Sequence, residues 1–473
     1  MSRGRRAVVF TVMIAAASGL AGCAAHLRAA DVALPAAYSA PSGALGAGAG
    51  REASIERWWV AFRDPQLDAL IDEALRASPD TQAALAALRQ ARAVRQGALT
   101  GFGPQGTPSV RAARQWARPG EGDVDSRTAS FDVSWEIDLL GRRGAARTSA
   151  DAALASAAFD FEATRVSLAA NVAQALFQAR ALEAQSREAG ETARIAGDLV
   201  RVADLKAGRG ILSQADAASF RAELANARAQ AAALRAQAQV QRRILLVLLG
   251  RARAGLETLS LEHPDLDPPL PPLSAPGELL IRRPDLQRAK ANVDAAAGRL
   301  VSARLAQLPT LSLVPSLTAS RLPAGANASV WTLGANLAAP VLDLPRLRAE
   351  SRLRTAEAEA AVLAYERAIG QAYAETENAL LTLAADRDRL ADLVVADAQA
   401  KAAFDAQEQG FRAGYIEAVT LLQTERTWRQ ARTALVAVRA ATLGDAVQAF
   451  KSLGGGWSPV EAQQLASETS HDR

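Results

Sequence analysis

The chain has 473 residues, of which 49% are hydrophobic and only 5% aromatic, and its formal net charge is +4. Alanine-rich stretches with so few aromatic side chains argue against several large globular cores and favour long helices. The small net charge gives no reason to expect a nucleic-acid partner, so we set that class of function aside.

Residues 1–22 have the pattern of a removable export signal. Arginines precede an apolar run from Ala7 to Leu20, which is shorter than the roughly 18 to 20 residues that span a bilayer. Small residues then lead to Cys23, the only cysteine of the chain. Because an exported chain with one thiol cannot form an internal disulfide, Cys23 has no structural role of that kind.

The end of this signal, Leu20-Ala21-Gly22-Cys23, resembles a bacterial lipobox, in which cleavage before the cysteine exposes it for acylation. The resemblance implies that Cys23 carries a covalent lipid, and Ala24 in place of Asp favours sorting to the outer membrane. A signal that happens to end near a cysteine is the alternative. With acylation, residues 23–54 form a lipid-anchored N-terminal tail.

Residues 55–262 are predicted to form a first structural repeat, which begins with a helix and continues into a β-hairpin at 105–140. From Ser126 to Leu140 apolar and polar side chains alternate strictly, which is the pattern of a strand. Residues 110–116 form the weakest predicted strand.

The polar face of the predicted strand carries three acidic residues, Asp132, Glu136 and Asp138. If the hairpin is part of a membrane barrel, these side chains line the lumen and make its wall acidic. Solvated outer loops are the alternative.

A long helical hairpin is predicted at 142–250. Residues 142–206 contain no proline and mostly strong helix formers, so they predict a helix of about 60 residues. Apolar side chains from Leu154 to Leu182 keep an alternating spacing of three and four, which indicates a coiled-coil seam. Gly208 and Gly210 allow a tight reversal before the next helix.

A Pro-rich stretch at 263–278 predicts an extended surface linker. The second repeat, 279–457, has the same order: a helix, a β-hairpin at 309–342 and a helical hairpin at 345–452. Residues 458–473 form a C-terminal tail.

The two halves also align residue by residue, which indicates an internal duplication. Pro79-Asp80-x-Gln82 matches Pro284-Asp285-x-Gln287 at an offset of 205 (284 − 79), and Gly210 matches Gly414 at an offset of 204 (414 − 210).

Two hairpins in one chain cannot close a barrel, so several chains are expected to share one. A lipid-anchored periplasmic coiled-coil scaffold would explain the helices but not the alternating strands.

Several motifs then resemble the TolC-like outer-membrane efflux protein family, in particular its lipoprotein branch that serves resistance-nodulation-division pumps. They are Trp58-Trp59-x-x-Phe62-x-Asp64-Pro65, Ser134-Trp135-Glu136-Ile137-Asp138-Leu139-x-Gly141, Arg282-Arg283-Pro284-Asp285-Leu286 and Leu453-Gly454-Gly455-Gly456-Trp457. The resemblance implies a mainly α chain with membrane β, in which a long helical-hairpin tunnel joins four strands of a shared trimeric outer-membrane barrel.

The same resemblance implies the partners and the localisation. The protein would be a homotrimer, anchored in the outer membrane and extending into the periplasm, and would meet a periplasmic adaptor and an inner-membrane pump of the resistance-nodulation-division type. The tips that contact the adaptor would include Gly208, Arg209, Gly210, Gly414 and Tyr415.

By resemblance, the periplasmic gate lies near Val419, Gln423 and Arg426. Val419 takes the place of an apolar constriction and Arg426 that of a basic lock, whereas Gln423 replaces an acidic residue of the family pattern. Because amides make a weaker field than carboxylates, we expect a gate that is less cation-selective and less strongly held by ion pairs. Solvated helix residues without a gating role are the alternative.

The sequence gives no sign of an enzyme. Its three histidines, His26, His263 and His471, lie in predicted tails and in the linker, and no phosphate-binding loop or metal-ligand cluster is present. No cofactor is expected apart from the covalent lipid. The expected function is a passive exit channel of a tripartite efflux system for small toxic compounds, and an outer-membrane duct for type I protein secretion is the alternative.

Overall fold

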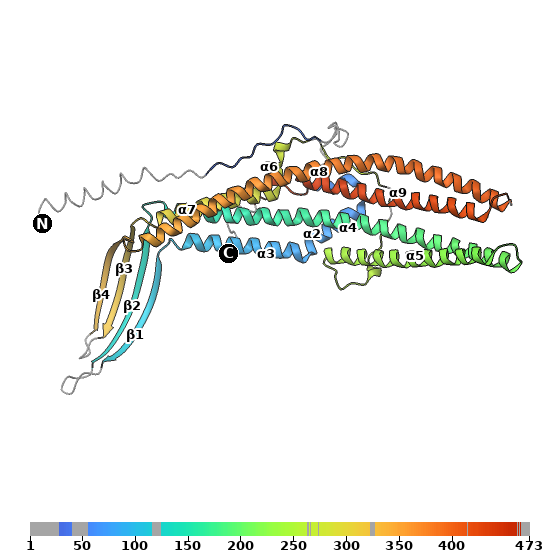
Figure 1. Ribbon diagram of the computed structural model, residues 1–473. Helices are drawn as coiled ribbons and strands as arrows, with labels where there is room; N and C mark the ends of the chain where they lie inside the picture. The colour runs from blue at the N-terminus through green and yellow to red at the C-terminus, as the bar shows by residue number, and fades with distance from the viewer. Residues whose placement is uncertain are drawn as a thin grey trace. The chain divides into compact units, whose positions relative to one another are not determined.

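The computed structural model describes residues 28–39, 55–115, 124–262, 264, 266–272, 274–321, 327–413, 415–460, 462 and 464. The chain divides into two compact units, which we describe separately (Figure 1). Unit 1 contains the β-sheet and the helix segments joined to it, and unit 2 contains most of the helical residues. Within the described ranges, no helix has both the length and the apolar character that a membrane span requires.

The predicted repeat is visible in the order and length of the elements. The first copy consists of α3 (Pro79–Thr100), β1 (Gln105–Gln115), β2 (Val124–Ile137), α4 (Arg142–Gly208) and α5 (Gln214–Leu248). The second copy consists of α7 (Pro284–Leu305), β3 (Thr310–Arg321), β4 (Asn327–Ala338), α8 (Leu344–Arg412) and α9 (Ala418–Ser452). The long helices α4 and α8 have 67 and 69 residues, and α5 and α9 have 35 each. The predicted mainly α fold with paired hairpins and a two-fold repeat is therefore confirmed.

Short elements surround these two copies. A 3-10 helix η3 (Ile55–Phe62) and helix α2 (Pro65–Ala77) precede α3. The 3-10 turn η4 (Leu256–Thr258) lies just before the predicted linker. The linker ends with the 3-10 turn η5 (Pro276–Glu278), and the short helix α6 (Leu279–Arg282) follows it.

Unit 1 is built on one antiparallel sheet with the strand order β1-β2-β3-β4. The two hairpins, which the sequence predicts as separate, are joined because β2 pairs with β3. That ladder is interrupted opposite Pro315, since Val133 and Ser134 have no partner on β3. Proline has no N–H to donate, which accounts for the break in a central strand.

The strand ends differ from the sequence predictions. The first strand begins at Gln105, five residues before the predicted start (110 − 105), and the predicted Trp116 lies outside the described residues. The second strand ends at Ile137 rather than at Leu140, because α4 begins soon afterwards. Asp138 is therefore not a strand residue.

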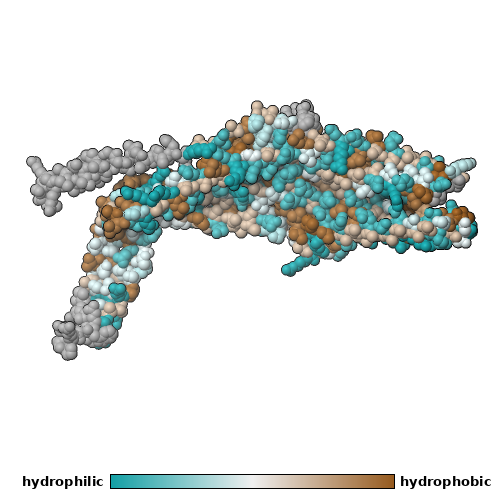
Figure 2. All heavy atoms as spheres, viewed as in Figure 1, coloured by the Kyte–Doolittle hydropathy of each residue, from teal (hydrophilic) through white to brown (hydrophobic). Residues whose placement is uncertain are grey.

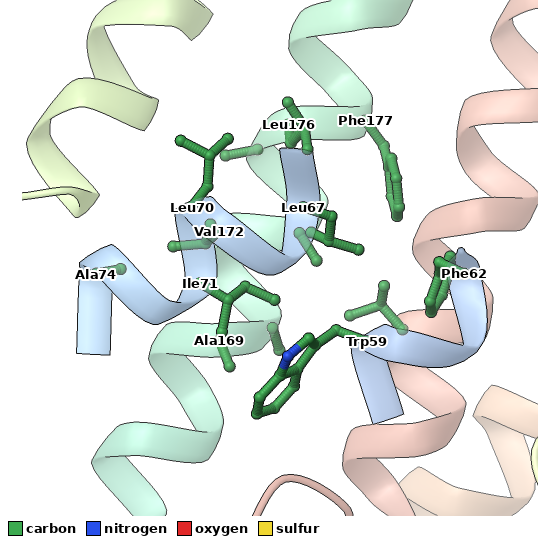
Figure 3. Packing of buried hydrophobic residues seen from close by; sticks show 14 of the residues in the cluster. Trp59, Phe62, Leu67, Leu70, Ile71, Ala74, Ala169, Val172, Leu176 and Phe177 are labelled. Atoms are coloured by element: carbon green, nitrogen blue, oxygen red, sulfur yellow. The ribbon is translucent and has the colours of Figure 1, made fainter. Parts of the chain in front are cut away.

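The main core of unit 2 lies where η3 and α2 pack against the middle of the long helices. Figure 3 shows Trp59 and Phe62 of η3 and Leu67 and Ile71 of α2 close to residues of α4. Trp58 is fully buried and stacks on Phe450 of α9, with 6.0 Å between ring centroids. Most of the predicted α4 seam is also buried, as shown by Leu154, Ala158, Leu168, Val172, Ala175 and Ala179.

A buried ion pair fixes the start of α2 against α4. Asp64 caps α2 by accepting hydrogen bonds from the backbone N–H groups of Gln66 and Leu67. Its carboxylate also accepts from the guanidinium of Arg180, and both side chains are almost fully buried. Removing one partner would leave an uncompensated buried charge, so this pair constrains the register of α2 on α4.

The glycine-rich turn after α9 packs on the turn before α7. Gly454 has φ +81°, and the indole Nε1 of Trp457 donates to the carbonyl oxygen of Arg282 over 2.6 Å. The N–H of Gly456 donates to the carbonyl oxygen of Ile55 over 2.8 Å. The C-terminal motif therefore joins the start of both repeats within unit 2.

Replacing Gly454 by Ala should destabilise the protein. The φ of +81° is unfavourable for Ala, and an added Cβ would lie 2.5 Å from the backbone oxygen of Arg282. We expect a loss of about 1 to 3 kcal/mol in the free energy of unfolding, measured by thermal denaturation in detergent.

Gly444→Ala is the matched control for this substitution. Gly444 lies inside α9, and a Cβ there would meet nothing within 4 Å. Helix propensity predicts a gain of about 0.5 to 1 kcal/mol. Equal stability of the two variants would contradict the role assigned to the Gly454 turn.

Candidate functional site

The sheet of unit 1 has one apolar face and one polar face. The apolar face carries Pro108, Phe131, Trp135, Leu311, Leu313, Leu317, Trp331, Leu333 and Leu337. Trp331 and Leu333 are each 79% exposed, which is costly for such large side chains in water. This face therefore requires an apolar environment.

The polar face is formed by rows of hydroxyl, amide and carboxylate side chains. One row across all four strands contains Thr107, Asp132, Ser316 and Thr332. A second row, nearer the helices, contains Glu136, Ser312 and Asn336. A wall of this kind suits contact with water.

The three acidic residues predicted for the lumen have different surroundings. Asp132 accepts a hydrogen bond from the hydroxyl of Ser130 over 2.8 Å, and Glu136 lies 3.4 Å from the guanidinium of Arg142. Asp138 accepts from the backbone N–H groups of residues 141, 142 and 143. Asp138 therefore caps the N-terminus of α4, a role that the alternating pattern did not predict.

The two edge strands have no partner among the described residues of the chain. β1 pairs only with β2, and β4 pairs only with β3. Each outer edge therefore presents backbone N–H and C=O groups that need hydrogen-bond partners. A further copy of the same sheet could supply them.

The hairpin of α4 and α5 turns where the two glycines predict it. Gly208 is the last residue of α4, and Gly210 has φ +72°, a conformation that favours glycine. The N–H of Arg209 donates to the carbonyl oxygen of Lys206 over 3.3 Å. Ile211, in the same turn, is 69% exposed and adds an apolar side chain to the tip.

The hairpin of α8 and α9 has a similar tip. Gly414 lies outside the described residues, but the neighbouring Tyr415 is 87% exposed. The N–H of Tyr415 donates to the carbonyl oxygen of Gly410 over 2.9 Å, which closes the end of α8. Each tip thus presents an apolar side chain.

The three predicted gate residues lie on the first turns of α9. Val419 and Gln423 are exposed, whereas the guanidinium of Arg426 forms an ion pair with Glu223 of α5. Arg426 therefore links the two helical hairpins within one chain.

Further along α9, charged residues form a network that sequence reasoning did not predict. Arg429 contacts Glu188 of α4 over 2.9 Å, and Arg432 contacts Asp397 of α8 over 3.4 Å. Burial raises the pKa of the nearby Glu425 carboxyl, although Arg429 opposes that rise. The network spans 241 sequence positions between Glu188 and Arg429, so no local pattern indicates it.

Two carboxyl groups meet where α8 and α9 pack together nearer the core. Burial, a hydrogen bond with Asp386 and the negative charge of Asp386 together raise the pKa of the Asp445 carboxyl to about 6. Thr442 is buried beside the pair, and its hydroxyl donates to the backbone oxygen of Val438 over 2.8 Å. This contact between the helices is therefore sensitive to pH.

The predicted lipidation site, Cys23, lies outside the described residues, as do the three histidines. The tail that follows Cys23 is described at residues 28–39. In unit 1, Arg28 and the N–H of Asp31 contact the Glu366 carboxylate over 2.9 and 2.8 Å. In unit 2, Tyr38 stacks on Tyr373, with 6.0 Å between centroids.

Long paired helical hairpins together with a two-faced sheet are the features expected of a channel-forming membrane protein. The profile of the outer membrane efflux protein family matches residues 70–251 and 275–455, one match for each repeat. The chain belongs to the outer membrane efflux protein family. It is an outer-membrane exit channel of an efflux system.

Curated relatives and solved structures agree with this assignment. The chain is 32% identical to the pyoverdine export outer membrane protein OpmQ of Pseudomonas aeruginosa, over 87% of this chain and 90% of the relative. It is 26% identical to the toluene efflux pump outer membrane protein TtgF of Pseudomonas putida, over 88% and 89%.

Among solved structures, the outer-membrane channel OprN superimposes with a TM-score of 0.77 and 29% identity, covering 91% of this chain and 99% of that one. The CmeC outer membrane channel of Campylobacter jejuni superimposes with a TM-score of 0.84 over 94% and 98%. Because CmeC is only 20% identical to this chain, its structural similarity supports the fold alone.

The carboxyl pair predicts a pH dependence of stability. The folded-state pKa of Asp445 is raised from 3.8 to about 6. The contribution of this carboxyl to the free energy of unfolding is therefore fully favourable below about pH 4 and is lost as the pH rises through 6. Asp445→Asn should therefore stabilise the protein relative to wild type at about pH 7.5 by on the order of 1 to 2 kcal/mol, and by less at about pH 5.

Thermal denaturation at the two pH values measures this difference. Asp388→Asn is the matched control, since Asp388 is an exposed residue of α8. We expect the control to show the same pH dependence as wild type. The assignment is wrong if Asp445→Asn and Asp388→Asn behave alike.

Proposed function

We propose that three copies of the chain assemble into one duct that crosses the outer membrane and extends into the periplasm. Each copy would contribute its four strands to a common barrel of about twelve strands, within the range of strand numbers known for outer-membrane barrels. The polar face of the sheet would line the lumen, and the apolar face would contact lipid.

The observation that carries this proposal is the sheet with an exposed apolar face and two edges that are unpaired among the described residues. In lipid no water can satisfy the backbone groups of an edge strand, so a stable sheet must close on itself. Four strands are too few to enclose a pore, whereas β1 of one copy can pair with β4 of the next. A cyclic assembly of copies satisfies every edge with one repeated contact.

The tips of the helical hairpins are the part of the chain that we assign to partner binding. Arg209, Gly210 and Tyr415 would contact a periplasmic adaptor, which connects the duct to an inner-membrane pump of the resistance-nodulation-division type. The exposed apolar side chains Ile211 and Tyr415 support a role in protein contacts.

We further propose that Cys23 carries the lipid and that transport through the duct is passive. Of the relatives named above, OpmQ is a pyoverdine export protein and TtgF belongs to a toluene efflux pump. On that basis we propose small organic compounds as the cargo, with the pump rather than the duct selecting among them.

A deletion strain tests this function. Loss of the gene should raise sensitivity to organic solvents, dyes or antibiotics, or reduce release of a siderophore, and the wild-type gene should restore the phenotype. A defect confined to a secreted protein would instead indicate a type I secretion duct. The purified protein should migrate as trimers on semi-native gels, and a monomer would contradict the shared barrel.

The same strain tests the lipid anchor when it carries Cys23→Ser. Provided that the variant is exported and cleaved, we expect it to lose the acyl chains but to retain trimers and efflux, because a closed barrel remains in the membrane without them. Loss of trimers in this variant would show that the lipid takes part in assembly.

The exposed Gln423 predicts a gate with a weak preference for cations. Gln423→Asp should add a ring of carboxylates at the narrow end of the duct and increase the cation-to-anion permeability ratio in single-channel recordings. The control is Gln430→Asp, also exposed on α9 and further from the tip. An unchanged ratio for Gln423→Asp would remove Gln423 from the gate.

A further inference from the structure

Two arginines lie directly opposite each other near the hairpin end of the sheet. Arg127 of β2 and Arg321 of β3 are register partners, so their side chains emerge side by side on the same face. Cβ atoms of such partners are typically about 5 Å apart, and like charges in that position repel each other. An anion between the two guanidinium groups would remove the repulsion.

Register places both arginines on the apolar face of the sheet. Arg127 is four residues from Phe131 along β2, and Arg321 is four residues from Leu317 along β3, so each points to the same side as that apolar residue. Both side chains are exposed. Among the described residues, neither arginine forms an ion pair with a carboxylate.

The two arginines of the neighbouring strand β1 have different surroundings. Arg114, in the next row toward the hairpin end, lies 3.7 Å from the carboxylate of Asp125. Arg111 pairs in register with Thr128 and therefore lies on the polar face. Among the described residues of the sheet, Arg127 and Arg321 are thus the arginines of the apolar face without a carboxylate partner.

The distance along the strand places the arginine pair at the outer border of the lipid-facing band. Ile137, at the helix end of β2, is ten residues from Arg127 (137 − 127), which corresponds to about 33 Å at roughly 3.3 Å per residue. A strand tilt of about 40° reduces this to a height of about 25 Å, the usual height of the apolar band of such barrels. Figure 2 shows hydrophilic side chains on the sheet toward its hairpin end.

We propose that Arg127 and Arg321 form a binding site for the phosphate groups of outer-leaflet lipid headgroups. This inference rests on the proposed barrel, because it requires the apolar face to contact lipid. The helices join the strands at the opposite end, so the hairpin end of a duct with periplasmic helices faces the cell exterior. Guanidinium groups bind phosphate oxygens through paired, charge-assisted hydrogen bonds, and two of them side by side suit a phosphorylated sugar headgroup of the lipid A type.

Binding of diphosphoryl lipid A to the full-length protein in mild detergent tests this site. We expect Arg127→Gln combined with Arg321→Gln to raise the apparent Kd by about tenfold, while the matched control Arg111→Gln keeps the wild-type Kd. Arg321→Asp should weaken binding as strongly, because its carboxylate would compensate Arg127 in place of the phosphate. Dephosphorylated lipid A should bind no better to wild type than to the double variant.

Three results would overturn the proposal. These are an unchanged Kd in the double variant, an equal loss in Arg111→Gln, and complete competition by inorganic phosphate at constant ionic strength, which would indicate a site for free anions. Semi-native gels of each sample show whether only the headgroup site is wrong or whether the proposed shared barrel is wrong as well. Trimers without lipid A binding contradict only the headgroup site, whereas a wild-type protein without trimers contradicts the shared barrel and the site together.

Discussion

A backbone N–H or C=O group at a sheet edge has no hydrogen-bond partner in lipid, and the architecture of this protein depends on that constraint. A single chain ends its sheet with β1 on one side and β4 on the other, and both edges remain open in the part of the chain that the structure describes. Closure with further copies satisfies these groups and at the same time gives the two faces their separate environments. The alternation of apolar and polar residues along each strand is then a requirement of the assembly rather than of the isolated chain.

Cohesion between the helical hairpins changes along their length. Near the core, Trp58 and Phe450 pack with aliphatic side chains of four long helices, and burial of such groups stabilises strongly. Toward the tips, the contacts between hairpins become ion pairs such as that of Arg426 with Glu223, in which the arginine side chain is 52% exposed. Exposed ion pairs contribute little stability, so the tips can separate at low cost while the core stays packed.

Local patterns in the sequence were sufficient for the parts of the fold that local physics determines. Strict alternation around Trp135 predicted β2, and the absence of proline after Arg142 predicted α4, because period and propensity act over neighbouring residues. The end of β2 was wrong by three residues, since Asp138 serves as a helix cap and capping competes with strand extension.

Contacts between segments that are far apart in the sequence could not be predicted from local patterns. The β2 to β3 pairing joins the two repeats, and nothing in either hairpin alone specifies it. Likewise, the ion pair of Arg180 with Asp64 and that of Arg429 with Glu188 join residues far apart in the sequence. In the sequence, the two arginines and Glu188 look like ordinary solvated helix positions, and Asp64 like a simple helix cap. Charge patterns indicate which residues can pair, but only the packing of the helices selects the partner.

The packing of Phe450 and Trp457 has a consequence for the order of folding. Both side chains complete clusters whose other members include Trp58 and Phe159, hundreds of residues earlier in the chain. A chain that crosses the inner membrane from its N-terminus exposes those earlier apolar residues long before their partners arrive. The nascent protein therefore needs protection from aggregation and proteolysis during export, and its helical unit can mature only after the C-terminal turn has been delivered.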